Sequence, residues 1–358
     1  MQKRFDLCQN LFGISEPELQ NLLKTTNGAE TIRRMTVYKP GEAKLYFSDY
    51  EPCLSDEKLP CPLDVSVINI GNVWSLELAN AKVGNADSLF QVASNFHGLE
   101  QMHPFQSPEQ TNLSDYFYDQ TQGPMAVLPT ALDLVWRRYL LKQSGPYTDA
   151  LLQSGKWPLD MLQKLHSSFS SKEKRGGVKI TVGGWADITE AKTPDTLSLC
   201  RSVGCVVVKN ALITHDQQGR FLGFRNMRVH QVLTSTLDMQ FMSTTFGRQW
   251  MNVFLIATYI NTLSVAWDLK VSKVFLTLIG GGVFENPIPC IFAAMATAIN
   301  SVSFDGLRTP PRIYIVMKQF DKGVSRSVEA YCCAKIVSDF SSNKITLSAC
   351  LEALSNMK

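Results

Sequence analysis

The sequence has no group of metal ligands at the spacing of a metal site. Its nine cysteines include no CxxC pair, and its five histidines are scattered along the chain as His97, His103, His166, His215 and His230. Structural zinc sites draw their ligands from closely spaced Cys and His pairs, so we expect no metal and no cofactor. An odd number of free thiols is typical of a reducing compartment, and the composition therefore predicts a cytoplasmic protein.

The chain also has little net charge and no long apolar run. Its formal net charge is +3 at pH 7, too small to predict a nucleic-acid-binding surface. The longest apolar stretch, residues 253–267, is shorter than the ~20 residues that cross a membrane. The first residues, MQKRFDLCQNLFG, lack the hydrophobic segment of a signal peptide. We therefore expect neither nucleic acid nor a membrane among the partners, and the sequence leaves the oligomeric state open.

What the sequence does have is a full hydrophobic complement and a regular alternation of elements in its second half. Hydrophobic residues make up 45% of the 358 residues, which fits two average domains or one large α/β domain. Apolar periodicity predicts a helix at 248–269, a strand at 274–279, a helix at 288–300 and a strand at 312–318. This alternation is typical of a mostly parallel sheet between helical layers. One more strand or helix is expected at 329–337.

The first half is predicted to hold shorter elements. A capping box, Ser15 with Glu18, indicates the start of a helix. A strand is expected at 35–40, and a hairpin at 65–83 with its turn at Gly71 and Asn72. Further predicted elements are a buried strand at 88–96, a helix at 129–141, and strands at 178–185, 205–215 and 224–236.

Composition also suggests how the chain is divided. Residues 142–176 are polar and close with SSFSSKEKRGG, so we expect a helical insertion there. We assign residues 1–64 to an N-terminal extension that packs on the core, and residues 65–358 to the main domain.

The stretch FLTLIGGGVFENP, residues 275–287, is the most informative part of the sequence. An apolar strand ends in Gly280, Gly281 and Gly282, and an Ala-rich helix follows. In open α/β sheets ligands bind beyond the carboxyl ends of strands, where glycines let the backbone approach an anion. The alternative is a tight turn without a ligand. The stretch lacks the GK[ST] of a Walker A motif and the GxGxxG of a dinucleotide site.

Two upstream stretches turn this pattern into a family resemblance. LFQVASNFHGLEQMHPFQSPE, residues 89–109, and YDQTQGPMAVLPTALDLVWRRYL, residues 118–140, accompany the glycine stretch in the same order. Together the three resemble the macrodomains, in the branch related to poly(ADP-ribose) glycohydrolase, which includes bacterial effectors that remove ADP-ribose from proteins. The similar segments run from about Leu11 to Val316. The resemblance implies a three-layer α/β/α fold with a mixed sheet, N-terminal additions and a helical insertion, and a host cytosol if the protein is exported as an effector.

The resemblance also implies a partner, ADP-ribose or an ADP-ribosylated protein, and a set of binding residues. Gly123 and the glycine run would grip the diphosphate from two sides. Asn95 or its neighbours would contact the distal ribose, and Phe284 would cover that ribose or lie in the core. The predicted binding residues are Ala93, Ser94, Asn95, Gln122, Gly123, Gly280, Gly281, Gly282, Val283 and Phe284.

Catalysis is where the sequence departs from the pattern. Cleavage of an ADP-ribosyl bond needs a carboxylate to activate water or protonate the leaving group. The resemblance implies acids on the helix before the glycine strand, where this chain has Ile256 and Ile260. Both isoleucines belong to the apolar face of that helix, so the helix is expected to be buried. The sequence therefore predicts slow or absent turnover even where binding is intact.

Three other carboxylates are candidates for catalysis. Glu100 follows the ASNF strand end but could be solvated, Asp119 could cap a helix, and Asp238 could lie in an exposed loop. Glu285 stands where the family pattern has glycine, and it would repel an anion unless it points away. Three functions stay open: an ADP-ribosyl hydrolase, a reader that binds ADP-ribose without cleaving it, and an interaction module that has lost the pocket.

Overall fold

The computed structural model describes ten stretches of the chain. They are residues 6–36, 38–52, 64–69, 73–119, 121–141, 158–168, 178–188, 198–241, 245–302 and 309–317. The element expected at 329–337, the hairpin turn at Gly71 and Asn72, and most of the insertion near 142–176 lie outside the described residues.

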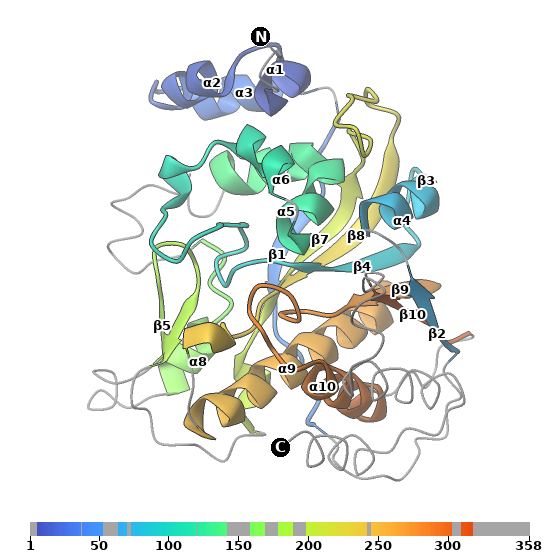
Figure 1. Cartoon of the computed structure of the whole chain (residues 1–358). Helices are drawn as coiled ribbons and strands as arrows, with labels where there is room; N and C mark the ends of the chain where they lie inside the picture. Colours follow the sequence, from blue (N-terminus) through green and yellow to red (C-terminus); the bar gives the residue numbers. More distant parts are fainter. Residues whose placement is uncertain are drawn as a thin grey trace.

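An eight-stranded mixed sheet forms the centre of the molecule (Figure 1). Its order is β1-β7-β8-β4-β9-β10-β2, and the short β3 pairs with β8. The pairs β4–β8, β4–β9, β9–β10 and β10–β2 are parallel, whereas β1–β7, β7–β8 and β3–β8 are antiparallel. The strands are β1 Glu42–Tyr46, β2 Val65–Asn69, β3 Lys82–Val83, β4 Ser88–Ala93, β7 Cys205–Leu212, β8 Met227–Thr234, β9 Lys273–Thr277 and β10 Arg312–Met317.

Helices lie on both sides of this sheet. Figure 1 shows α5 and α6 on one side and α9 and α10 on the other, with α1, α2 and α3 stacked beyond α6. The helices are α1 Leu7–Phe12, α2 Glu16–Leu23, α3 Gly28–Met35, α4 Val73–Asn80, α5 Gln122–Val127, α6 Ala131–Tyr139, α8 Gln163–Ser168, α9 Thr245–Leu269 and α10 Ile288–Ser301. The predicted three-layer α/β arrangement with a mixed sheet is confirmed.

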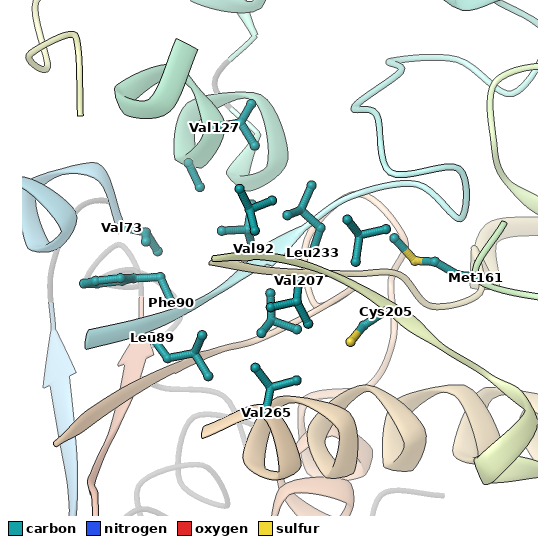
Figure 2. Packing of buried hydrophobic residues seen from close by; sticks show 14 of the residues in the cluster. Val73, Leu89, Phe90, Val92, Val127, Met161, Cys205, Val207, Leu233 and Val265 are labelled. Atoms are coloured by element: carbon teal, nitrogen blue, oxygen red, sulfur yellow. The ribbon is translucent and has the colours of Figure 1, made fainter. Parts of the chain in front are cut away.

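The hydrophobic core fills the space between the sheet and both helical layers. In Figure 2, Val127 of α5 lies on one side of the strands that carry Leu89 and Leu233, and Val265 of α9 lies on the other. All four side chains are buried. Phe90 of β4 and Phe275 of β9 stack with their ring centroids 4.3 Å apart, which joins the two strands at the centre of the sheet.

Several predicted elements are confirmed. The capping box of Ser15 and Glu18 starts α2. The long helix, the glycine-strand, the Ala-rich helix and the last parallel strand are α9, β9, α10 and β10. β1, which falls in the predicted N-terminal extension, pairs with β7 in the main sheet. The division of the chain at residue 64 stays a prediction.

Two predicted elements are wrong. Residues 28–35 form α3, and the strand begins only at Glu42, because Pro40 has no N–H to donate to a neighbouring strand. The second strand of the hairpin expected at 65–83 is helix α4. Since β2 lies in the same parallel set of strands as β4, the chain between them must make a crossover, which a hairpin cannot provide.

Candidate functional site

A cavity of about 950 Å³ opens at the carboxyl ends of β4, β8 and β9. Its walls come from the residues after those strands, from the start of α5, and from Val73, Phe117 and Trp185. The structure brings together all ten residues predicted to bind ADP-ribose, since each of them lines this cavity: Ala93, Ser94, Asn95, Gln122, Gly123, Gly280, Gly281, Gly282, Val283 and Phe284. Their roles in binding stay predictions.

One wall of the cavity is the glycine loop, which we define as residues 278–286. Gly280 has φ +74°, and a Cβ there would clash with Thr236, so only glycine fits without strain. Gly282 differs, because a Cβ built on it meets no atom within 4 Å. Among the described residues, no acceptor pairs with the backbone N–H groups of Gly280, Gly282, Val283 and Phe284. The loop therefore presents a set of unpaired donors to the cavity wall.

Buried side chains hold this loop in shape. Asn286 donates through Nδ2 to the carbonyl oxygens of Leu237, Gly280 and Phe284 at 2.9, 3.2 and 3.3 Å. The hydroxyl of Tyr259, on α9, donates to the Thr277 carbonyl at 2.7 Å. The same oxygen accepts from the Ile279 N–H at 3.2 Å. The loop is therefore fixed before any ligand arrives.

The opposite wall is the start of α5. The N–H groups of Gln122 and Gly123 also lack an acceptor among the described residues. Gly123 was expected to let a ligand approach, but its Cβ would lie 2.7 Å from the Ala93 carbonyl oxygen, so its small size serves the packing of α5 on β4. α5 is only six residues long and continues through a 3₁₀ turn toward α6. The donors here are consequently the first backbone groups of a short helix.

Asn95 was expected to contact the distal ribose. Its side-chain amide donates to the carbonyl oxygens of Gln101 at 3.0 Å and Gly183 at 2.8 Å. Both amide hydrogens are therefore bound to the protein backbone. Asn95 lines the cavity and at the same time fastens the loop after β4 to the hairpin that contains Gly183.

Glu100 is not a solvated residue, contrary to the reading of its position in the sequence. It lines the cavity, and its side chain is 2% exposed and lies 3.6 Å from the Arg137 guanidinium. Neither carboxylate oxygen accepts a hydrogen bond within the described part of the chain. Burial raises the pKa of Glu100 to about 7, and Arg137 opposes that rise. The cavity thus contains a buried carboxyl group that gains and loses its proton near neutral pH.

The other two carboxylate candidates are placed differently. Asp119 lines the cavity and accepts from the Thr121 N–H at 2.8 Å, so it caps the turn into α5. Asp238 was expected in an exposed loop, but it is 8% exposed, and it is not among the residues that line the cavity. Burial, with a further contribution from Glu285, raises the pKa of Asp238.

Glu285 and the isoleucines of α9 answer two questions from the sequence. Glu285 is exposed, and its carboxylate accepts from Gln240 at 3.3 Å, away from the residues that line the cavity. Ile256 and Ile260 are buried, as expected, and no described residue of α9 lines the cavity. Acids at those two positions would not reach the site, so their absence does not bear on its chemistry.

Trp185 is the main residue of the site that sequence reasoning missed. It lies on the hairpin of β5 Val178–Ile180 and β6 Ala186–Ile188, and its ring packs edge-on against Phe284 with centroids 4.8 Å apart. The signal was the pair of glycines directly before it in VGGW, which indicates a tight turn that presents the tryptophan. Thr234, at the end of β8, was also missed.

Polar atoms without partners gather around the cavity. Within the described residues, no hydrogen-bond partner is found for Gln122 Nε2, Thr234 Oγ1, Trp185 Nε1 or the two oxygens of Glu100. Buried polar atoms are normally paired, so such a group on one cavity wall indicates a polar ligand. The described residues hold no cluster of three or more His, Cys, Asp or Glu side chains placed to bind a metal, and no described helix is long and apolar enough to cross a membrane.

Comparison with known proteins gives matches among solved structures. No family model and no curated protein matches the chain. It is similar to a point mutant of poly(ADP-ribose) glycohydrolase from Deinococcus radiodurans in complex with ADP-ribose, with 10% identity, a TM-score of 0.43, and coverage of 93% of this chain and 100% of that chain. It is also similar to poly(ADP-ribose) glycohydrolase from Thermomonospora curvata, with 11% identity, a TM-score of 0.44, and coverage of 92% and 89%.

Proposed function

We propose that the cavity binds ADP-ribose, either free or attached to a protein. The observation that carries this proposal is the set of unpaired backbone N–H groups in the glycine loop, on the wall of a cavity of about 950 Å³. Successive N–H groups of this kind form a concave site for an anion without a charged side chain. A diphosphate fits such a site, and the unpaired N–H groups of Gln122 and Gly123 lie on the other wall.

The two ends of the cavity suit the two ends of ADP-ribose. At one end Val73 and Phe117 offer apolar and aromatic surface, which favours a planar base. At the other end Asn95, Glu100 and Trp185 offer polar atoms, which favour the hydroxyl groups of a sugar. The volume is also within the range of small-molecule sites.

Calorimetric titration with ADP-ribose tests the proposal, with Gly282→Glu as the discriminating variant. A side chain at Gly282 meets no protein atom, so the variant should fold, yet it places a negative charge on the wall that would hold the diphosphate. We expect wild-type protein to bind and Gly282→Glu to lose binding. Val83→Glu is the control, since Val83 is 77% exposed and does not line the cavity. Equal affinity of wild type and Gly282→Glu would overturn the proposal.

A second candidate function is hydrolysis of the bond between ADP-ribose and a modified protein, and the observation that favours it is Glu100. A general acid works best with a pKa near the working pH, and the pKa of this buried carboxyl is about 7. The protonated group would donate to the leaving atom of the modified side chain as the ribose develops oxocarbenium character, and the carboxylate would then take a proton from the attacking water.

Release of ADP-ribose from ADP-ribosylated protein separates a hydrolase from a reader. If Glu100 carries the chemistry, Glu100→Gln should lower release by about a hundred- to ten-thousand-fold, whereas Asp238→Ala should retain it, because Asp238 does not line the cavity. Asp119→Ala tests the third candidate. Binding without release in wild type would assign the protein as a reader. The alternative of a module without a pocket gains no support from this geometry.

A further inference from the structure

Trp185 is held rigidly against the cavity by the tight turn that precedes it. The Gly183 carbonyl accepts from Asn95 at 2.8 Å, and the Gly183 N–H donates to the Pro104 carbonyl at 2.9 Å. The Gly184 carbonyl accepts from the Phe96 N–H at 2.7 Å. Three bonds from two residues thus fasten the hairpin to the segment after β4. The indole ring is placed by the fold and needs no rearrangement to meet a ligand.

The indole of Trp185 has one donor and no protein partner for it. Nε1 is buried, and the described residues offer it no acceptor. Buried tryptophan N–H groups usually find a partner, because an unpaired donor out of water is unfavourable. The ring lines the cavity and meets Phe284 edge-on at 63°. An acceptor supplied by a ligand in the cavity would complete this arrangement.

The part of the ligand that reaches Trp185 follows from its neighbours. Asn95 bonds directly to the Trp185 hairpin, and Gln101, which accepts from the same Asn95 amide, is adjacent in the chain to Glu100. The aromatic end of the cavity, with Val73 at the start of α4, lies on the other side of α5 in Figure 1. Trp185 therefore belongs to the polar end, beyond the glycine loop.

We propose that Trp185 donates its indole N–H to a ribose oxygen beyond the diphosphate and, with Phe284, forms a subsite that selects ligands carrying this sugar. The inference rests on the proposed function and adds to it a residue that distinguishes ADP-ribose from ADP. Trp185 acts as a specificity-determining residue, because its donor meets only the part of the ligand that ADP lacks.

The test compares two ligands on two proteins by calorimetric titration. Trp185→Phe keeps an aromatic ring beside Phe284 and removes only the N–H donor. We expect its affinity for ADP-ribose to fall about three- to tenfold, as for the loss of one hydrogen bond, and its affinity for ADP to stay unchanged. The preference for ADP-ribose over ADP should fall by the same factor. Trp185→Leu, which also removes the ring, should lower that preference further.

Trp267→Phe is the matched control. Trp267, on α9, has a buried Nε1 without an acceptor in the described part of the chain, but it does not line the cavity. Its replacement should leave both affinities unchanged. If wild type binds ADP-ribose and Trp185→Phe changes neither affinity, or lowers both equally, the sugar subsite is wrong while the proposed function stands. If wild type does not bind ADP-ribose, the proposed function fails and the subsite fails with it.

Discussion

Glu285 is a residue whose backbone conformation conflicts with its side chain. It has φ +51°, in the left-handed region, and it stands where the family pattern has glycine. A left-handed conformation costs a residue with a Cβ roughly 1–2 kcal/mol. We predict that Glu285→Gly raises the free energy of unfolding by about 1 kcal/mol, measured by urea denaturation. Glu285→Ala should give no such gain, because it keeps the Cβ; a gain of equal size in both variants would assign the effect to charge.

Glu100 should make stability depend on pH. Its pKa of about 7 in the folded protein is higher than the ordinary 4.5, so between these values the folded state holds a proton that the unfolded state has released. The resulting stabilisation is present at low pH and is lost as the pH rises through 7. Glu100→Gln cannot titrate. We predict that the stability of this variant relative to wild type increases from pH 5 to pH 8, by on the order of 1–3 kcal/mol.

This comparison isolates Glu100 from the buried histidines. Burial lowers the pKa of His97 to about 3 and those of His215 and His230 to about 4, so they stabilise the fold increasingly as the pH rises toward 6.5. Their effect is the same in wild type and Glu100→Gln, and it cancels in the difference. A difference in unfolding free energy that does not change with pH would contradict the assignment.

Helix α9 supports the site from behind and does not supply its chemistry. Ile260 is 2% exposed and does not line the cavity. We predict that Ile260→Asp lowers the free energy of unfolding by roughly 3–5 kcal/mol, because it buries an unpaired carboxyl, and that it does not raise release of ADP-ribose. Ile260→Val is the control and should cost about 1 kcal/mol. Faster release by a folded Ile260→Asp protein would show that this face of the helix reaches the ligand.

The elements differ in how far the sequence could predict them. α9, β9 and α10 have strong apolar periods and were predicted within a few residues. α4 was mistaken for a strand, because its apolar residues fit both periods over so short a stretch, and only the parallel pairing of β2 decides for a helix. The cavity residues on motifs were found, but Trp185 was not, since a hairpin distant in sequence reaches the site only through its hydrogen bonds with Asn95, Phe96 and Pro104.

The N-terminal helices are tied to the site through buried polar contacts. Glu16 of α2 is 3% exposed; its carboxylate accepts from the Leu113 N–H at 3.0 and 3.1 Å and from the Tyr139 hydroxyl at 2.7 Å. Leu113 starts the 3₁₀ helix Leu113–Tyr118, which leads directly to the wall formed by Asp119 and Gly123. The helices before β1 therefore contact the same segment that borders the cavity.

We predict that Glu16→Ala lowers the free energy of unfolding by roughly 1–3 kcal/mol, because the Leu113 N–H loses its acceptor in a buried place. The loss should appear as one cooperative transition in urea, seen alike by tryptophan fluorescence and circular dichroism, and ADP-ribose affinity should fall with it. Glu30→Ala is the control, since the Glu30 side chain is 55% exposed in its ion pair with Arg34, and surface pairs contribute little. An early, separate transition in Glu16→Ala, with the cavity still binding its ligand, would instead mean that the N-terminal helices unfold on their own and that the chain divides before its main sheet.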